Sequence, residues 1–165
     1  MITLLVAAVA GVVAWAFEPA SPHAQGTARL ELRVIREFPH DADAFTQGLL
    51  WHDGALYEST GLPGRSSVRR VNLESGEVQQ VQALDDRFFG EGLARVGDRL
   101  IQLTWRNRRA IVWSADDLEQ LDVHAYRGEG WGLCHDGERL IMSNGSHVLA
   151  FRDPETFERL GSVQV

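Results

Sequence analysis

The sequence predicts an all-β protein assembled from repeated four-stranded units, and three observations carry this prediction. One sequence motif occurs three times, at residues 45–61, 88–105 and 129–145. Each copy is followed by two more short apolar runs with a turn signal between them, and no helical periodicity is found beyond residue 27. Four short strands in each repeat of about 40–45 residues are typical of a β-propeller blade.

The spacing inside the three copies is what identifies them as repeats. Each copy contains a Gly-Leu pair, a leucine eight residues after that glycine, and an end point thirteen residues after it. The glycines are Gly48, Gly92 and Gly132, the leucines are Leu56, Leu100 and Leu140, and the end points are Gly61, Trp105 and Gly145. Fixed offsets that recur at a period of this length indicate a repeat architecture.

We expect a partial β-propeller domain over residues 28–165, with blades at about 45–84, 89–126 and 129–165. Closed propellers have about four to eight blades. Three blades are too few to close a ring, so we expect this chain to be part of a longer protein.

An additional strand is expected ahead of the first repeat. Residues 28–38, ARLELRVIREF, alternate apolar and charged side chains, and a period of two predicts a half-buried strand. No earlier repeat could receive this strand, so we expect it to close the last blade of a complete ring.

Turn signals divide each repeat into strands. The first hairpins are expected to turn at Asp53-Gly54, Gly97-Asp98 and Asp136-Gly137, because Gly and Asp favour tight hairpin turns. Two further strands are expected in each repeat, at 68–71 and 77–84, at 110–113 and 120–126, and at 147–151 and 159–165.

Residues 1–27 are expected to be a signal peptide, or an N-terminal membrane anchor, followed by a linker. Residues 4–17 form an uncharged apolar run. The run is shorter than the roughly 20 residues of a spanning helix and suits the core of a signal peptide. No basic residue precedes it, so both interpretations stay open. In either case we expect the folded part to be exported to the periplasm or the extracellular space.

Composition excludes several classes of function. The chain has 165 residues and a formal net charge of -7, which disfavours a nucleic-acid partner. Its single cysteine, Cys134, leaves no internal disulfide and no cysteine-based metal site, and the six histidines have no ligand-like spacing. We therefore expect no bound metal, and no motif in the sequence indicates a cofactor.

Candidate functional residues follow from the repeat. The first strand of a propeller blade lines the central channel, so equivalent residues at the start of these strands should meet at one channel mouth. Directly before the three repeat glycines stand Gln47, Glu91 and Trp131, and two positions earlier stand Phe45, Phe89 and Glu129. Aromatic walls with a few polar groups are typical of a ligand pocket.

Each polar candidate has a plain structural alternative. A glutamate at a strand end is most often solvated, but Glu91 lies between two glycines and beside Phe88 and Phe89. Glycines permit close approach of a ligand, and a poorly hydrated aromatic setting raises the pKa of a carboxyl group. Gln47 could bind a ligand or could only cap the channel mouth through hydrogen bonds.

The tryptophans fall into two groups. Trp105 and Trp131 could line the pocket, or they could be core residues between blades. Trp51 and Trp113 lie at other repeat positions, and we expect both to be packing residues.

Five phrases, in order and at matching spacing, resemble the plant-type and bacterial glutamine cyclotransferases, which are metal-independent glutaminyl-peptide cyclotransferases. The phrases are FTQGL at 45–49, YESTG at 57–61, FGEGL at 89–93, LTW at 103–105 and GEGWGL at 128–133. The resemblance implies a five-bladed propeller, monomeric and without a cofactor. It also implies an enzyme that converts the N-terminal glutaminyl residue of a peptide or protein to pyroglutamyl and releases ammonia.

The resemblance also implies roles for individual residues. Glu91 matches the catalytic acid/base of the family. The residues that match its substrate pocket are Phe45, Gln47, Phe89, Trp105 and Trp131. The family pattern places further pocket residues in later blades, beyond Val165.

The chemistry of ring closure agrees with these roles. The α-amine of the substrate attacks its own γ-carbonyl, so the substrate itself supplies proximity. One carboxyl group with a pKa near neutrality can carry a proton from the amine to the departing ammonia, while aromatic walls hold the folded-back substrate and exclude water.

Two other functions remain open from the sequence alone. A non-catalytic propeller of the cell envelope could bind peptides or protein partners at the same channel mouth. A propeller hydrolase or lactonase would need several metal-binding carboxylates and asparagines in the channel, and the mouth offers few of them.

Overall fold

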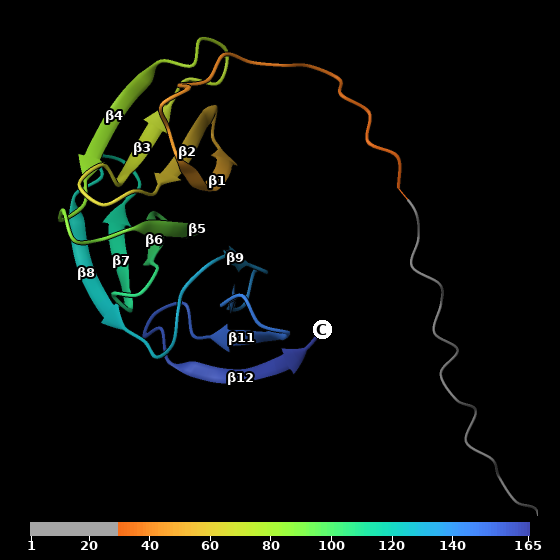
Figure 1. Ribbon diagram of the computed structural model, residues 1–165, viewed down its shortest axis with the longest axis vertical. Coiled ribbons are helices and arrows are strands. Elements are labelled where there is room, and N and C mark those ends of the chain that lie inside the picture. The colour runs from red at the N-terminus through yellow and green to blue at the C-terminus, as the bar shows by residue number, and fades with distance from the viewer. Residues whose placement is uncertain (1–29) are drawn as a thin grey trace, which may run out of the picture. The chain divides into compact units, whose positions relative to one another are not determined.

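Twelve β-strands make up the ordered elements of residues 30–165, the part of the chain that this computed structural model describes. They form three antiparallel four-stranded sheets (Figure 1). The first sheet contains β1 (Thr46–His52), β2 (Ala55–Thr60), β3 (Ser67–Val71) and β4 (Val78–Ala83). The second contains β5 (Gly90–Val96), β6 (Arg99–Thr104), β7 (Arg109–Ser114) and β8 (Gln120–Ala125), and the third contains β9 (Leu133–His135), β10 (Leu140–Met142), β11 (Val148–Arg152) and β12 (Arg159–Gln164). The predicted all-β propeller class is confirmed.

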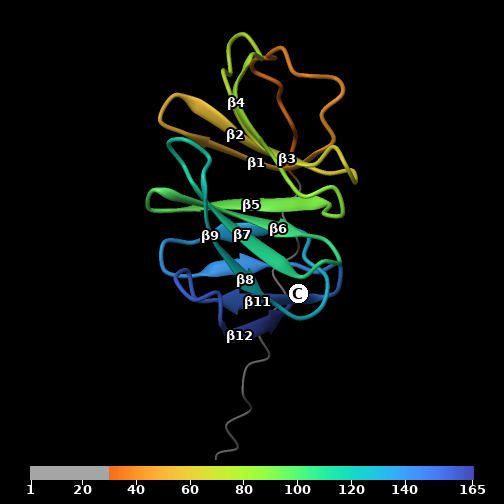
Figure 2. The same cartoon turned by 90° about the vertical axis from the view of Figure 1, so that its left-hand side faces the viewer.

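Neighbours in sequence are neighbours in every sheet, so each sheet is a simple meander. Within residues 36–165, which form one compact unit, the sheets follow one another from the first to the third (Figure 2). The strands β4, β8 and β12 form the outer edges, while β1, β5 and β9 face the concave side (Figure 1). This is the packing of successive propeller blades.

Tight turns lie where the sequence indicates them. Asp53 and Gly54 join β1 to β2 with φ values of 47° and 76°, the left-handed pair that a type I′ hairpin turn requires. Gly97 and Gly137 also have positive φ, at 61° and 104°. Each first hairpin is therefore set by local turn chemistry.

Two hydrophobic clusters hold adjacent sheets together. Between the first and second sheets lies a cluster with Tyr57, Val68, Leu93 and Trp113. Between the second and third lies another, with Ile101, Leu103, Met142 and Phe157. Side chains on opposite faces of the second sheet thus bury themselves against different neighbours, as period-two alternation demands.

The inner strands approach one another closely because of their glycines. A Cβ atom on Gly48 would lie 2.7 Å from the backbone nitrogen of Leu93, and one on Gly92 would lie 2.4 Å from that of Leu133. The Gly92 N–H also donates to the Trp131 carbonyl at 2.7 Å. Gly48 and Gly92 are therefore needed for contact between blades.

The strand expected at residues 28–38 is not formed in its described part, and its closure of the last blade of a complete ring stays a prediction. Residues 28 and 29 lie outside the described part, and residues 30–38 are in no strand. Leu30 and Leu32 are 91% and 93% exposed. Alternation produces a strand only where a partner backbone accepts its hydrogen bonds, and none of the described strands pairs with this segment.

Side chains fasten the next residues to the first sheet instead. Asp41 pairs with Arg69 at 2.7 Å, and His40 lies 2.9 Å from the buried carboxyl of Glu58. The expected signal or anchor at 1–27 falls wholly outside the described residues. Among residues 30–165 there is no helix of the length and hydropathy that a membrane crossing needs.

Candidate active site

Glu91 lies in a β-bulge at the start of β5. Gly90 pairs with Thr104 and Leu93 pairs with Gln102, so two residues of β5 oppose one of β6. A similar irregularity surrounds Gln47 at the start of β1, between Thr46 and Gly48. Bulges redirect side chains and are common beside active sites. Gln47 and Glu91 thus leave the regular alternation of their strands at equivalent points.

Glycines on both sides of Glu91 allow it to be buried there. A Cβ on Gly90 would lie 2.5 Å from the carbonyl oxygen of Thr60, and one on Gly92 would lie 2.5 Å from that of Trp131. No larger residue fits either place without moving backbone. Glu91 is only 9% exposed as a result.

The side chain of Glu91 is largely buried, but its carboxyl oxygens are not among the atoms sealed from solvent in the described part of the chain. No hydrogen bond or ion pair from residues 30–165 reaches its side chain. Burial, together with the nearby charge of Glu129, raises the pKa of Glu91 to about 7, because both effects penalise the ionised form. The group can therefore gain or lose a proton near neutral pH.

A row of aromatic rings lies at the same end of the inner strands. Phe45 and Phe89 meet edge to face with centroids 6.0 Å apart, and Phe89 meets Trp105 at 5.8 Å. Phe89 also packs on Gly61, where a Cβ would lie 2.4 Å from the ring. Phe45 remains 49% exposed, so the row forms a wall that is open to solvent on one side.

Glu129 joins the two candidate tryptophans. The indole N–H of Trp105 donates to its Oε2 at 2.7 Å, and the indole N–H of Trp131 donates to the same oxygen at 3.1 Å. Arg106 donates to the other oxygen at 3.2 Å. Hydrogen bonds from Trp131, Trp105 and Arg106 hold the pKa of Glu129 below its usual range. Glu129 is therefore a fixed anion.

Trp131 lies at the mouth rather than in the core. Its side chain is 45% exposed, and it rests on Gly145, where a Cβ would lie 2.9 Å from its Cζ2 atom. Gly145 has a φ of 77°, which a glycine adopts without strain. Gly145, the last glycine of this repeat, thus leaves the space in which the indole of Trp131 packs.

Tyr126 directly follows β8, the last strand of the second sheet, and its side chain is buried. Its hydroxyl donates to the Thr104 carbonyl, and it packs against Gly130. Burial is the main cause that raises the pKa of Tyr126 to about 12, and the charge of Glu91 contributes. Tyr126 is thus a neutral neighbour of Glu91 and no proton donor near pH 7.

The structure brings the candidates together unevenly. Phe45, Phe89 and Trp105 are in contact, and Trp105 is joined to Trp131 through Glu129. The half-buried Gln47 stands at the equivalent place on β1, but within the described chain its side chain makes no hydrogen bond.

The expectation for the other two tryptophans is half right. Trp113 is a packing residue, 3% exposed. The prediction for Trp51 is wrong: it is 55% exposed and lines a cavity of about 310 Å³ with residues of β5 and β9. The reason is that Trp51 belongs to the inner strand β1, and the sheets of residues 30–165 leave its side chain more than half exposed.

Sequence reasoning placed Glu129 at the mouth but missed what it does. Its equivalence to Phe45 and Phe89 was the available signal. The hydrogen bond from Trp105 to Glu129 joins residues 24 positions apart, and that from Trp131 joins residues 2 positions apart. No local sequence pattern predicts the first of these bonds. Across residues 30–165, no three His, Cys, Asp or Glu side chains gather where they could hold a metal ion.

Comparisons with known proteins show the family to which this chain belongs. The family model described as glutamine cyclotransferase matches residues 4–165. A glutaminyl-peptide cyclotransferase of Arabidopsis thaliana is 42% identical over 130 residues, which are 78% of this chain and 41% of that protein. The chain thus spans about two fifths of that relative's length.

Solved structures give the same result. The glutaminyl cyclase of Myxococcus xanthus superposes with a TM-score of 0.74 at 41% identity, over 81% of this chain and 56% of that one. The WD40 domain of Neurospora crassa Pan2 superposes with a TM-score of 0.61 at 12% identity, over 72% of this chain and 36% of that one. The second likeness supports the propeller fold alone.

Proposed function

Because this chain belongs to the glutamine cyclotransferase family, we propose that the protein carrying it converts the N-terminal glutaminyl residue of peptides to pyroglutamyl, with release of ammonia. One observation carries the proposal. Glu91 is a largely buried residue whose carboxyl group has no partner among the described residues, it lies at the start of the inner strand that Phe89 precedes, and burial raises its pKa to about 7. A carboxyl group in that state suits proton transfer at neutral pH.

Glu91 serves as the proton carrier in this proposal. The α-amine of the substrate attacks the γ-carbonyl carbon, and the new C–N bond closes the five-membered ring. The bond between that carbon and the side-chain amide nitrogen then breaks. Glu91 in its ionised form takes a proton from the attacking nitrogen and returns it to the departing one. The proton balance closes within the site, since ammonia leaves with the proton that the amine lost.

The aromatic side chains hold the substrate in the folded-back conformer. Phe45, Phe89 and Trp105 form a continuous wall, which can cover the methylene groups of the glutaminyl side chain. Trp131, partly exposed at the mouth, would cover the following peptide. Since ring closure is intramolecular, restricting the conformer is a large part of the catalytic task.

Gln47 and Glu129 support this arrangement in different ways. Gln47 stands in the bulge at the start of β1 with an uncommitted side chain, and we assign it to the amide or the α-amine of the substrate. Glu129 holds the indoles of Trp105 and Trp131 in place. Because three donors keep it ionised, Glu129 is a positioning residue and not a second proton carrier.

The proposal includes export of the protein. Its support is the apolar run at 4–17, which has the length of a signal-peptide core. Fractionation of cells that express a C-terminally tagged protein tests it, and tagged protein confined to the cytosol would remove this part of the proposal.

The function is tested by incubating the protein that carries this chain with a glutamine-initiated peptide. We expect ammonia in solution and a peptide lighter by one ammonia, and we expect a chelator to leave the rate unchanged. A peptide with the same sequence after an N-terminal alanine should release nothing. Binding of the glutamine peptide without any ammonia would instead support the non-catalytic envelope propeller.

A further inference from the structure

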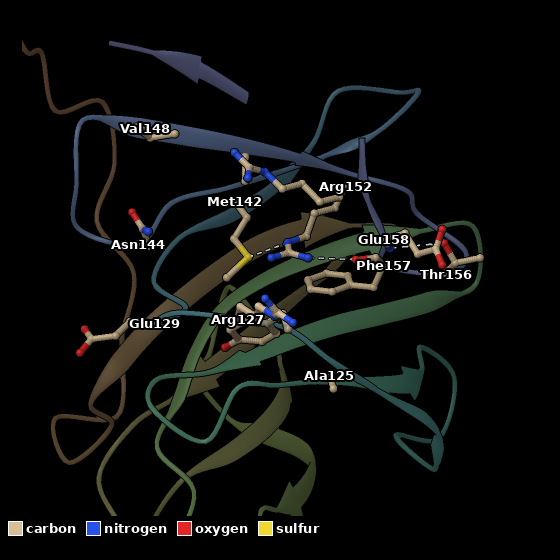
Figure 3. Close-up of a pocket in the computed structure, with 13 residues that line it drawn as sticks. Ala125, Arg127, Glu129, Met142, Asn144, Val148, Arg152, Thr156, Phe157 and Glu158 are labelled. Atoms are coloured by element: carbon tan, nitrogen blue, oxygen red, sulfur yellow. Dashed lines mark hydrogen bonds between the residues drawn. The ribbon is translucent and has the colours of Figure 1, made fainter. Parts of the chain in front are cut away.

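A cavity of about 590 Å³ lies between the second and third sheets (Figure 3), and its lining shares Tyr126 and Glu129 with the surroundings of Glu91. The carbon-rich part of its wall comes from Tyr126, Met142, Val148, Ala150 and Phe157. Three arginines also line it, Arg127, Arg152 and Arg159, together with two glutamates, Glu129 and Glu158. The lining therefore combines an apolar wall with charged residues, of which Arg152 is the buried one.

The same position between the first and second sheets provides an internal comparison. A cavity of about 570 Å³ lies there, lined by the equivalent parts of the repeat. Blades diverge toward their outer strands, so the space by itself is a property of the fold. What distinguishes the two cavities is the chemistry of their lining.

One repeat position shows the difference most clearly. Leu100 pairs with Trp113 on β7, and its counterpart Leu140 pairs with Arg152 on β11. Trp113 uses its only donor on the side chain of Gln102, at 3.0 Å. Arg152 has five N–H donors and stands at the place of a neutral indole.

Arg152 is held firmly but its donors are not all used. It is 8% exposed. Its Nε donates to the sulfur of Met142 at 3.0 Å and its Nη1 to the Phe157 carbonyl at 3.0 Å, as Figure 3 shows. The guanidinium also lies 4.7 Å from the ring centre of Phe157. Nη2 makes no hydrogen bond to the described residues, and it is not among the atoms sealed from solvent.

No carboxylate of residues 30–165 neutralises this guanidinium. The nearby Arg159 bonds only Ser162, and its charge adds to the burial that lowers the pKa of Arg152. Two acids line the cavity, Glu129 and Glu158. Glu129 is committed to the two indoles and Arg106. Glu158 makes no ion pair with Arg152, whose hydrogen-bond partners are Met142 and Phe157. Buried charges in proteins are normally paired, and within residues 30–165 the guanidinium of Arg152 has no such pair.

We propose that this cavity binds a small organic carboxylate whose aromatic or aliphatic body lies against Tyr126, Met142 and Phe157. The carboxylate accepts hydrogen bonds from Nη2 of Arg152, and Arg127 and Arg159 complete its electrostatic environment. A planar guanidinium matches the two oxygens of a carboxylate. The walls leave room for an apolar body that inorganic phosphate lacks.

Ligand-observed NMR with 3-phenylpropanoate as the probe tests the proposal on the whole protein. The neutral isostere 3-phenylpropanamide has the same shape, and inorganic phosphate has charge without the ring. We expect the carboxylate to bind at least about tenfold more tightly than the amide, the usual worth of a charge-assisted hydrogen bond. Equal binding of acid and amide, or competition by an equal concentration of phosphate, overturns the proposal.

The variant Arg152→Gln should weaken binding of 3-phenylpropanoate by about tenfold or more. Arg109→Gln is the matched control, because it removes one positive charge from the lining of the other cavity and should leave the affinity unchanged. An equal loss in both variants would assign the effect to net charge and refute the site.

Because Arg152 is buried, its substitution could prevent folding. Ala150→Leu keeps the guanidinium and fills part of the cavity from β11. We expect this variant to lose binding of the probe while it keeps a native circular dichroism spectrum. Undiminished binding in Ala150→Leu would place the probe elsewhere and overturn the proposal.

Discussion

The start of β5 and the loop before β9 each contribute one glutamate to the same mouth, and the two carboxyl groups are in opposite states. Glu91 lies in a bulge between two glycines, buried and without a partner among the described residues. Glu129 lies in the loop, where three side-chain donors surround it. The pKa of Glu91 is raised to about 7, and that of Glu129 is lowered.

The difference teaches that environment, not residue type, assigns the roles. Burial without hydrogen bonds destabilises the charged form of a carboxyl group, whereas donors stabilise it. Pairs of titratable groups whose pKa values are driven apart are typical of acid/base sites. The two acids are also coupled, since the charge of Glu129 is one cause of the raised pKa of Glu91.

The largest expected effect separates the two roles. Glu91→Gln should lower turnover of a glutamine-initiated peptide by on the order of 10²-fold or more, because it removes the proton carrier. Glu138→Gln, at an exposed turn, is the control and should retain full activity. Unchanged turnover in Glu91→Gln would show that the proton travels by another route.

A smaller loss is expected at the positioning residue. Glu129→Gln keeps one oxygen acceptor but loses the charge that attracts the two indoles, so we expect kcat/KM to fall by about tenfold, the worth of a charged hydrogen bond. Steady-state kinetics measure it. A loss as large as that of Glu91→Gln would contradict the division of roles.

The pH profile tests the coupling between the two acids. Glu91 must be ionised to accept the proton of the amine, so kcat/KM should rise with pH through about 7. The α-amine of the substrate also titrates in this region, but its contribution is the same for every variant. In Glu129→Gln the charge that raises the pKa of Glu91 is gone, so the rise of kcat/KM that follows ionisation of Glu91 should move to lower pH. A shift to higher pH would contradict the coupling.

The smallest effect concerns stability. The pKa of Glu91 is higher in the folded protein than its ordinary 4.5, so the folded state binds more protons between pH 4.5 and 7 and stability falls as the pH rises through that window. In Glu91→Gln no carboxyl group ionises at this position, so the fall in stability with rising pH should be absent. We expect its melting temperature to exceed that of the wild type by a few degrees at pH 8, and by less at pH 5. Equal differences at both pH values would show that burial does not perturb Glu91.

Sequence reasoning succeeded where the controlling interactions are local. Gly54, Gly97 and Gly137 place the hairpin turns through their own backbone conformations. The turn signals that bound 68–71 and 110–113 place β3 and β7, two strands that are paired on both edges. Alternation alone gave no strand at 30–38, because whether an alternating segment pairs depends on a partner that the segment does not specify.

The turn before the outer strand shows how packing overrides local preference. Gly76 in the first repeat has a positive φ, and so do Leu118 and Phe157 at the equivalent places, with φ values of 61° and 60°. Bulky residues rarely adopt this conformation. Both side chains are nearly fully buried, at 1% and 2% exposed, so burial between the sheets offsets the strain. Nothing in the sequence marks either residue as a turn position.

The amino-acid sequence by itself determined the repeat, its strands and turns, and the phrases that place Phe45, Phe89 and Glu91 at equivalent points of successive units. All of these depend on spacing along the chain. Tertiary structure decided that Glu91 lacks a partner within residues 30–165, that Glu129 accepts from both indoles, and that Arg152 replaces the indole of Trp113 between the sheets. These properties arise from burial and from contacts between separate strands and loops, and a one-dimensional pattern contains neither.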